Sequence, residues 1–298
     1  IAFHSDGVDI AGCTAVPVGG SEQATCTTST LPPGTHAITA NYSGDGNWAP
    51  SSSDPLSQVI LAPAALTLSP NPIAFPSTPV GTPATPIVET LTNSGGSPVV
   101  VSSVVLTGAN PGDFSLASNT CNGATVAAGG SCTVVVAFTP TVAGARTASL
   151  SVTDNIAGSP QTVPITGTGT VPGIGFSPNP IAFPGTPVAT AAGPITETIS
   201  NTGAAPLTIT GVTLAGADAG DFSLASNTCN GATVAAGGSC TVIVAFTPAV
   251  AGARTASLSV SDNIAGSPQT VAITGTGTVP GATVTPNPLS FPATTVGA

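Results

Sequence analysis

The strongest constraint on this chain of 298 residues is an internal repeat with a period of 108 residues. Residues 113–173 return as residues 221–281 with four substitutions and without a gap. The substituted pairs are Val135 and Ile243, Thr141 and Ala249, Thr153 and Ser261, and Pro164 and Ala272. Solenoid repeats have periods of roughly 20–50 residues, so a period of this length indicates that a whole domain is duplicated in tandem.

The repeated unit carries the pattern of β-strands. Between residues 146 and 153, Ala148, Leu150 and Val152 alternate with threonine and serine, which predicts a strand with one buried face. Further strands are expected at 66–70, 73–76, 85–93, 98–107, 113–117, 131–139 and 161–168, separated by glycine-rich turn signals at 93–96 and 127–130. Seven or eight short strands in about 108 residues, with no helix of useful length, are typical of an immunoglobulin-like sandwich. The predicted fold class is therefore all-β, with tandem immunoglobulin-like β-sandwich domains in an extended array.

The repeat and its short Val-Pro-Gly connectors define the expected domains. Residues 1–63 form a partial domain of different sequence, 64–171 the first repeat, 172–280 the second repeat, and 281–298 the first strands of a third. The connectors at 171–173 and 279–281 each contain a proline, which fixes one backbone angle. Because the connectors are short and stiff, neighbouring domains are expected to lie end to end.

The charge composition excludes several classes of partner. The chain has no lysine, and Arg146 and Arg254 stand against twelve carboxylates. Nucleic acid is excluded because nothing could neutralise a run of phosphates, and a basic patch for anionic lipid is absent. Residues 155–196 carry no charge, but glycine and proline interrupt them too often for the roughly 20 apolar residues of a membrane-spanning helix.

The cysteines fall into three close pairs, one for each candidate domain. The pairs are Cys13 with Cys26, Cys121 with Cys132, and Cys229 with Cys240. This spacing indicates local disulfides formed in an oxidising compartment, which places the chain outside the cell or at its surface. Zinc is the disfavoured alternative, since no CxxC motif is present and the only histidines are His4 and His36. Closing so short a loop contributes roughly 3 kcal/mol by the loop-entropy argument.

Six ordered blocks in the repeat carry a family resemblance. They are FxxxxVG, LTNSGGSPVVVSSVVLTG, GDFSL, GGSCTVVVAFTP, ASLSVTDN and PQTVPITGTGT. Together they resemble the bacterial ASH-type immunoglobulin-like repeat, which is related to hydin and abnormal-spindle domains. The resemblance implies a seven-stranded sandwich used as a spacer or scaffold, usually extracellular and repeated in its bacterial members.

The first 61 residues resemble a second family. The segment LPPGTHAITANYSGDGNWAPSSSDPL at 31–56 is similar to a bacterial immunoglobulin-like repeat of large surface proteins. On this comparison the chain starts and ends within domains. Two explanations stay open: the sequence is an excerpt of a longer polypeptide, or a neighbouring subunit donates the remaining strands, since an unpaired sandwich edge invites strand addition.

A search for reactive side chains predicts neither an enzyme nor a cofactor. The two repeats contain no histidine, no lysine and no cysteine outside the pairs, which removes most acid-base and nucleophilic schemes. Asp218 and Asp221 are close enough to suggest paired carboxylates, but a turn explains them better, because Asn110 stands at the first-repeat position of Asp218. Candidate calcium ligands are Asp45 with Asn47, Asp154 with Asn155, and Asp262 with Asn263. Their spacing lacks the density of a calcium loop, so a role as turn formers is favoured and no metal site is predicted.

Several other side chains carry specific expectations. Glu89 and Glu197 share a strand face with apolar neighbours, so each is expected either to pair with its repeat's arginine or to be turned outward by a bulge. Tyr42 and Trp48 could form a carbohydrate platform, but core packing is favoured. His36 is expected at the surface or at a strand edge. Asn41 opens a glycosylation sequon, Asn-Tyr-Ser.

Taken together, these features predict a non-enzymatic structural component of an extracellular fibre or filament on a bacterial cell surface. Its disulfide-stapled domains act as rigid spacers, and identical chains are expected to associate, with strand exchange as one means of assembly. The alternative is the stalk of a large adhesin whose binding head lies outside this segment. A third interpretation is an accessory region of an enzyme. Glycans are further partners to consider.

Overall fold

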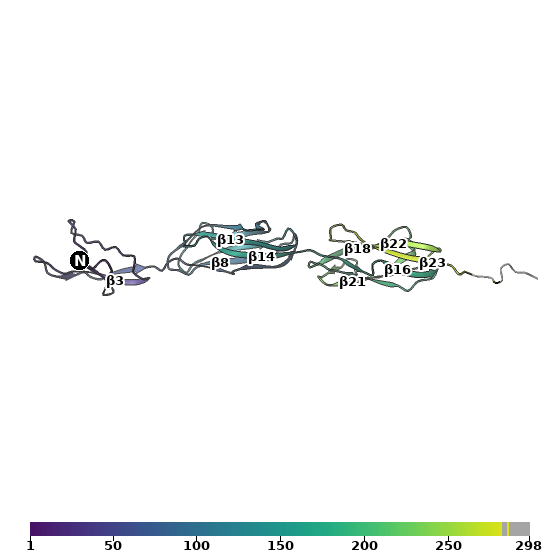
Figure 1. Ribbon diagram of the computed structural model, residues 1–298, viewed down its shortest axis with the longest axis horizontal. Helices are drawn as coiled ribbons and strands as arrows, with labels where there is room; N and C mark the ends of the chain where they lie inside the picture. Colours follow the sequence, from purple (N-terminus) through teal and green to yellow (C-terminus); the bar gives the residue numbers. More distant parts are fainter. Residues whose placement is uncertain (282–284, 286–298) are drawn as a thin grey trace, which may run out of the picture. The chain divides into compact units, whose positions relative to one another are not determined.

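The computed structural model describes residues 1–281 and residue 285, so the predicted start of a third repeat lies almost wholly outside the described residues. Its regular secondary structure is nearly all β-strand (Figure 1). Its helical elements are two 3₁₀ turns, η1 (Pro111–Asp113) and η2 (Ala219–Asp221). The expected fold class, tandem immunoglobulin-like sandwiches, is confirmed.

The N-terminal segment forms one five-stranded sheet. Its strands are β1 (Ala2–Ser5), β2 (Val8–Asp9), β3 (Gly34–Tyr42), β4 (Ser51–Ser52) and β5 (Leu56–Ile60). β3 pairs antiparallel with β1, β4 and β5. The register places Phe3, Ile38, Leu56 and Ile60 on one face, because Ile38 lies opposite both Ser5 and Leu56 and side chains alternate along each strand. Leu56 is 65 % exposed, so this apolar face is only partly covered.

Each repeat forms a two-sheet sandwich. The first contains β6 (Leu66–Ser69), β7 (Ile73–Pro79), β8 (Ile87–Asn93), β9 (Val99–Thr107), β10 (Phe114–Asn119), β11 (Thr125–Val126), β12 (Ser131–Phe138), β13 (Gly144–Asp154) and β14 (Gln161–Thr170). One sheet has the order β10-β12-β8-β6 and the other β11-β9-β13-β14-β7. The sandwich therefore closes around the apolar faces that the alternating pattern predicted.

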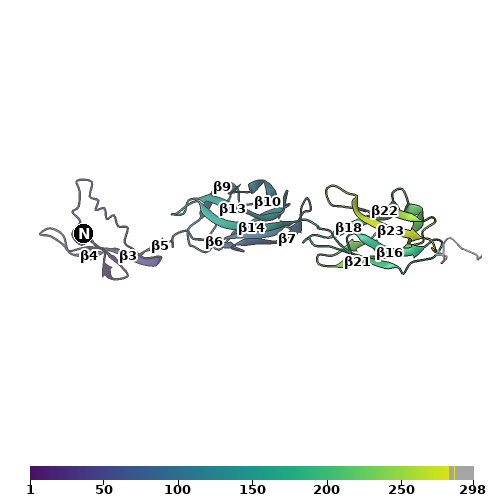
Figure 2. The same ribbon diagram turned by 45° about the vertical axis from the view of Figure 1, so that its right-hand side comes forward.

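The second sandwich repeats this topology. Its strands are β15 (Gly175–Ser177), β16 (Ile181–Pro187), β17 (Ile195–Ser200), β18 (Leu207–Ala215), β19 (Phe222–Asn227), β20 (Thr233–Val234), β21 (Ser239–Phe246), β22 (Gly252–Asp262) and β23 (Gln269–Thr278). The sheet orders are β15-β17-β21-β19 and β16-β23-β22-β18-β20. In two views of the molecule, β16 lies beside β23 (Figures 1 and 2).

The strands expected in the first repeat are present, and their ends differ from the expected bounds by up to three residues. β7 runs to Pro79, three residues beyond the expected end, because an edge strand tolerates proline where its missing N–H would face away from the sheet. The short strand β11 was not predicted, since two residues cannot show a period. The strand expected at 146–153 is the longer β13, whose Ala148, Leu150 and Val152 are buried.

Three phenylalanines form the centre of each core. In the second sandwich the rings of Phe222 and Phe246 stack with centroids 4.8 Å apart, and Phe183 packs 5.4 Å from Phe246. A Cβ atom on Gly275 would lie 2.6 Å from the Phe246 ring. The Thr-Gly-Thr-Gly-Thr run of β23 therefore points its threonines outward and leaves room inside for the aromatic ring.

We expect Gly275→Ala to lower the free energy of unfolding of the second sandwich by roughly 1–3 kcal/mol, since the added methyl group overpacks the ring. The matched control is Thr276→Val on the exposed face of the same strand, for which little change is expected. Chemical denaturation of both variants measures the effect. Equal stabilities of the two variants would contradict this account of the glycine.

Candidate functional site

The single arginine of each sandwich contacts one or two aspartates. In the second sandwich, Arg254 Nε lies 2.5 Å from Asp221, and a terminal guanidinium nitrogen contacts Asp218. The short turn η2 holds Asp221, whereas Arg254 stands near the start of β22. Asp221 is 7 % exposed. The cluster therefore ties a buried loop carboxylate to a strand, which is a structural role.

The first sandwich keeps the same contact with one charge fewer. Arg146 Nε donates to Asp113, which is 4 % exposed. Asn110 Oδ1 accepts the backbone N–H of Thr147 at 3.1 Å, just as Asp218 accepts that of Thr255 at 2.8 Å in the second sandwich. Asparagine can therefore accept the same backbone N–H as aspartate but cannot form the ion pair with arginine. This shared hydrogen bond explains why asparagine and aspartate both occur at this position of the repeat. Asp218 and Asp221 consequently have the arginine between them rather than a space for substrate.

Glu89 and Glu197 are fully buried, and both expectations for them are wrong. Neither carboxylate pairs with an arginine, and neither is turned outward, since both residues are 0 % exposed. In the described part of the chain, neither carboxylate has a hydrogen bond of ordinary geometry. Burial raises the pKa of each to about 7, and the backbone of Ser177 acts in the opposite direction on Glu197. The alternation rule placed these carboxylates on the core face correctly.

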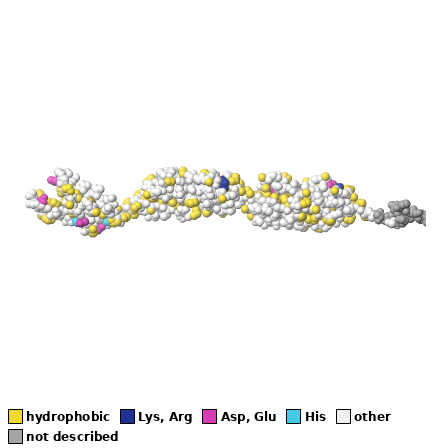
Figure 3. Space-filling model, in the orientation of Figure 1, with side chains coloured by type: hydrophobic (Ala, Val, Ile, Leu, Met, Phe, Trp, Pro, Cys, Tyr) yellow, Lys and Arg dark blue, Asp and Glu magenta, His cyan; other side chains and the backbone are white. Residues whose placement is uncertain are grey.

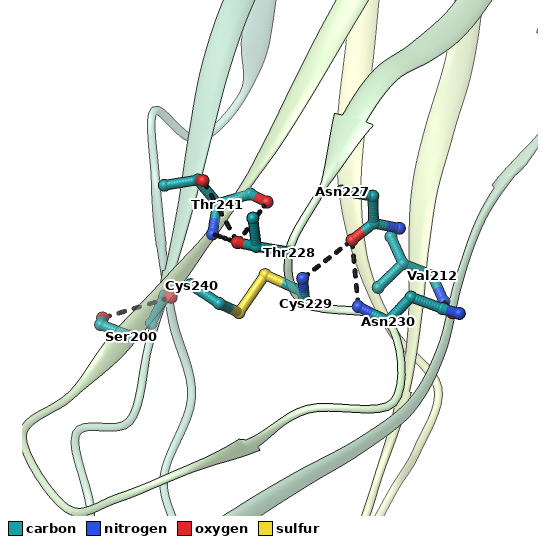
Figure 4. Close-up of a disulfide and its surroundings, with 9 residues drawn as sticks. Ser200, Val212, Asn227, Thr228, Cys229, Asn230, Cys240 and Thr241 are labelled. Carbon is teal, nitrogen blue, oxygen red and sulfur yellow. Dashed lines mark hydrogen bonds between the residues drawn. A yellow bond between two sulfur atoms is a disulfide. The ribbon is translucent and has the colours of Figure 1, made fainter.

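In each sandwich a disulfide closes the connection between two paired strands, β10 and β12 in the first and β19 and β21 in the second. Cys229, just beyond β19, is bonded to Cys240 in β21 (Figure 4). Asn227 Oδ1 accepts the backbone N–H groups of Cys229 and Asn230, at 3.0 and 3.1 Å, which fixes the turn around the sulfur atoms. The structure also joins Cys121 to Cys132, and Cys13 to Cys26. Each bond lies within a local loop and stabilises one domain.

The expectation that His36 lies at the surface or at a strand edge is wrong, because His36 is 8 % exposed and its strand β3 is paired with both β1 and β5. Its Nδ1 lies 2.7 Å from Asp6 and its Nε2 lies 2.8 Å from the carbonyl of Pro32. Both partners can only accept, so both ring nitrogens are donors and the imidazolium form is favoured. These contacts, led by the Pro32 carbonyl and followed by Asp6, raise the pKa of His36.

Trp48 is 72 % exposed, so the expectation that it packs in a core is wrong. It lies in the loop between β3 and β4, where Asp45 Oδ1 accepts the N–H groups of Asn47 and Trp48 at 2.7 and 2.9 Å. Tyr42 is half-buried at the end of β3. Asp45 is thus a turn former, and its hydrogen bonds from Tyr42, Asn47 and Trp48 lower its pKa.

The other candidate calcium ligands also close turns. Asp154 Oδ1 accepts the N–H of Ile156 at 2.8 Å, and Asp262 Oδ1 accepts that of Ile264 at 2.7 Å. Among residues 1–281 and 285, no group of three or more His, Cys, Asp or Glu side chains is placed to hold a metal ion. The sequon residue Asn41 lies in β3, opposite Ala2 and Ser52.

Most of the surface visible in Figure 3 carries neither charge nor a large apolar side chain. The arginines and acidic residues appear as a few isolated spots. No helix in the described part of the chain is long and apolar enough to cross a membrane. The aspartates of the sandwiches are accounted for by ion pairs or by turns, whereas Glu89 and Glu197 are buried in the cores.

Comparison with known families agrees with both resemblances. Residues 1–60 match the bacterial Ig-like domain of group 3. Residues 61–162 match the abnormal spindle-like microcephaly-associated, ASPM-SPD-2-Hydin domain, abbreviated ASH. Residues 193–276 match the HYDIN/CFA65/VesB-like Ig-like domain. None of the three is an enzyme family, and no curated protein matches the chain.

Solved structures resemble parts of the chain at low sequence identity and low TM-score. A Porphyromonas gingivalis protein of unknown function is 15 % identical, with a TM-score of 0.30, covering 71 % of this chain and 99 % of that one. The secreted serine protease VesC of Vibrio cholerae is 12 % identical, with a TM-score of 0.31, covering 62 % and 47 %. A sialic acid binding region of a Streptococcus sanguinis adhesin is 10 % identical, with a TM-score of 0.27, covering 72 % and 78 %.

Proposed function

We propose that this chain, one bacterial Ig-like segment followed by two ASH-type Ig-like domains, is a non-catalytic spacer in an extracellular bacterial fibre or filament. The observation that carries the proposal is the same in both sandwiches. Each arginine and each disulfide makes its contacts within one domain, and each core glutamate is buried within one domain. Repeating such domains makes the chain longer and leaves its surface chemically inert, which is what a spacer requires.

Disulfides and surface-type Ig-like domains support an extracellular or secreted location. Assembly between identical chains is supported by the N-terminal sheet. A hollow of about 430 Å³ opens on its apolar face, lined by side chains that include Phe3, Ile10, Ile38 and Ile60. A partly covered sheet face of this kind gains free energy when another chain covers it.

We therefore expect the wild-type chain to self-associate in non-reducing buffer, and Leu56→Glu to weaken that association. The charge would have to be buried on the apolar face, which is unfavourable unless a partner charge is supplied. Val142→Glu is the matched control, because Val142 is 52 % exposed and belongs to the first sandwich rather than to this sheet. Sedimentation velocity and negative-stain electron microscopy measure the outcome.

Filaments with an axial repeat that are lost in Leu56→Glu and kept in Val142→Glu would support the proposal that the chain is a filament component. Monomeric rods from all three proteins would favour the alternative, in which the chain is the stalk of a large surface adhesin. The match of residues 1–60 to a bacterial Ig-like family is the observation that favours this second candidate.

A further inference from the structure

We propose that the second sandwich contains a mechanical clamp, formed by the parallel strands β16 and β23, which resists tension applied between the two ends of the domain. The biological use of such a clamp rests on the proposed spacer function. The response to force is a property of the domain alone and can be measured whether or not the chain forms filaments.

The clamp joins the beginning of the domain to its end. β16 is the first strand of its sheet along the chain and β23 is the last. They pair in parallel, with Ile181 opposite Ile273 at one end and Pro187 opposite Thr278 at the other. The chain therefore enters the pair at one end and leaves it at the opposite end.

This arrangement determines how tension acts on the hydrogen bonds. Pulling the two ends of the domain apart draws β16 and β23 in opposite directions along their own axes. The bonds between the strands lie at an angle to this direction, on both sides of a register shift between Ala182 and Gly185, so they share the load and must break together. In an antiparallel hairpin both chain ends lie at the same edge, and the bonds break one after another.

Three features anchor the pair. Ile181 and Ile273 are fully buried in the core. Beyond β16, the N–H of Val188 donates to the carbonyl of Thr278 at 2.9 Å, and that of Ala189 to Pro248 at 2.9 Å. β23 is also paired with β22 along its length, so β23 is held on both sides, whereas β16 is an edge strand. The hydrogen bonds that must break before β16 can slide along β23 are therefore the ones that resist force.

The first sandwich has the equivalent strands. β7 and β14 are neighbours in its second sheet, and the N–H of Val80 donates to the carbonyl of Thr170 at 2.9 Å. Val80 and Thr170 occupy the repeat positions of Val188 and Thr278. The clamp is thus part of the repeated unit.

The test is single-molecule force spectroscopy of the full chain, pulled in two directions. Handles at Val171 and Val279, which are 47 % and 65 % exposed, load the second sandwich from end to end. Handles at Val171 and the exposed Ala265 load it across the strands. The loop that contains Ala265 lies at the entry end, since Asn263 Nδ2 donates to Pro206 and the N–H of Ala205 donates to Val171.

We expect the rupture force to be several-fold higher from end to end than across the strands. Val188→Pro removes the N–H that bonds Thr278 and should lower only the end-to-end force. Val80→Pro, the same change at the repeat position outside the handles, should leave both forces unchanged. Reduction of the Cys229–Cys240 disulfide should increase the chain length released on end-to-end unfolding by about 35 Å, because the disulfide keeps a segment of 11 residues from extending.

Equal rupture forces in the two directions would overturn the clamp, as would an end-to-end force that Val188→Pro does not lower. Neither result bears on the spacer function, which the association experiment tests separately. Both pulling directions use the same folded protein, so a folding defect in the proline variant does not remove the comparison.

Discussion

Replacing Glu89 with leucine is expected to stabilise the first sandwich by about 3 kcal/mol at pH 7 and above. Glu89 is fully buried and lies opposite Val134, which is also fully buried. Its carboxylate has no hydrogen bond of ordinary geometry among the described residues. Ionising it there is unfavourable, whereas a leucine side chain fits the apolar surroundings.

The same residue predicts a pH dependence of definite sign. Burial raises the pKa of Glu89 from 4.5 to about 7, so the folded domain binds a proton that the unfolded chain has released. Its contribution to stability is fully present below pH 4.5, falls between pH 4.5 and 7, and stays low at higher pH. Strands β6 and β12 beside it carry no ionisable group, and in the facing sheet the ionisable residues are Arg146 and Asp154.

Denaturant unfolding at several pH values from 4.5 to 8 measures both effects. Glu89→Gln is the matched control, because glutamine keeps the shape of the side chain and does not titrate. In this variant the stability of the first sandwich should lose the pH dependence that Glu89 causes. The gain should stay below the about 3 kcal/mol expected for leucine, since the buried amide lacks hydrogen-bond partners. The unchanged Glu197 in the second sandwich serves as an internal reference. A wild-type stability that rises relative to Glu89→Gln between pH 4.5 and 7 would contradict the prediction.

Arg146→Gln is expected to destabilise the first sandwich by about 3 kcal/mol, since it takes the cation from a buried carboxylate. Asp113 is 4 % exposed, whereas the arginine side chain keeps 17 % of its surface exposed. The cost therefore falls at the lower end of the range for broken buried pairs. Thermal or chemical denaturation of the oxidised protein at pH 7 measures it.

Two further variants separate the ion pair from packing. Arg146→Gln with Asp113→Asn should recover much of the loss, because the uncompensated charge is gone. Asp218→Asn in the second sandwich should change stability little, since asparagine occupies the equivalent position, Asn110, in the first. If the double variant is as unstable as Arg146→Gln alone, the loss comes from packing of the arginine stem.

Local patterns were sufficient to predict the fold. The alternation in 146–153 reappears as β13, with its apolar residues inside. The same alternation placed Glu89 and Glu197 on the core face. Turn-forming aspartates were recognised at Asp45 and Asp154, because an Asx turn involves only the next two or three residues.

Contacts between distant segments could not be predicted in this way. Arg146 was considered as a partner of Glu89, but it forms its ion pair with Asp113. The path of the chain between the two sheets decides which loop lies next to which strand, and the local pattern does not contain this information. His36 is buried through Asp6 and Pro32, one of which lies thirty residues away. Trp48 lies in a loop, where no strand pattern indicates whether a side chain is covered.

The repeat could be recognised because segments 108 residues apart are nearly identical. The all-β class, the strand faces and the spacing of the cysteines could be predicted because each depends on residues close together in the chain. Tertiary structure alone decided the partner of each arginine, the isolation of the core glutamates and the parallel pairing of β16 with β23. The physical reason is that these features depend on how two sheets close over one another. Periodicity within a strand specifies which face is buried, but not what it is buried against.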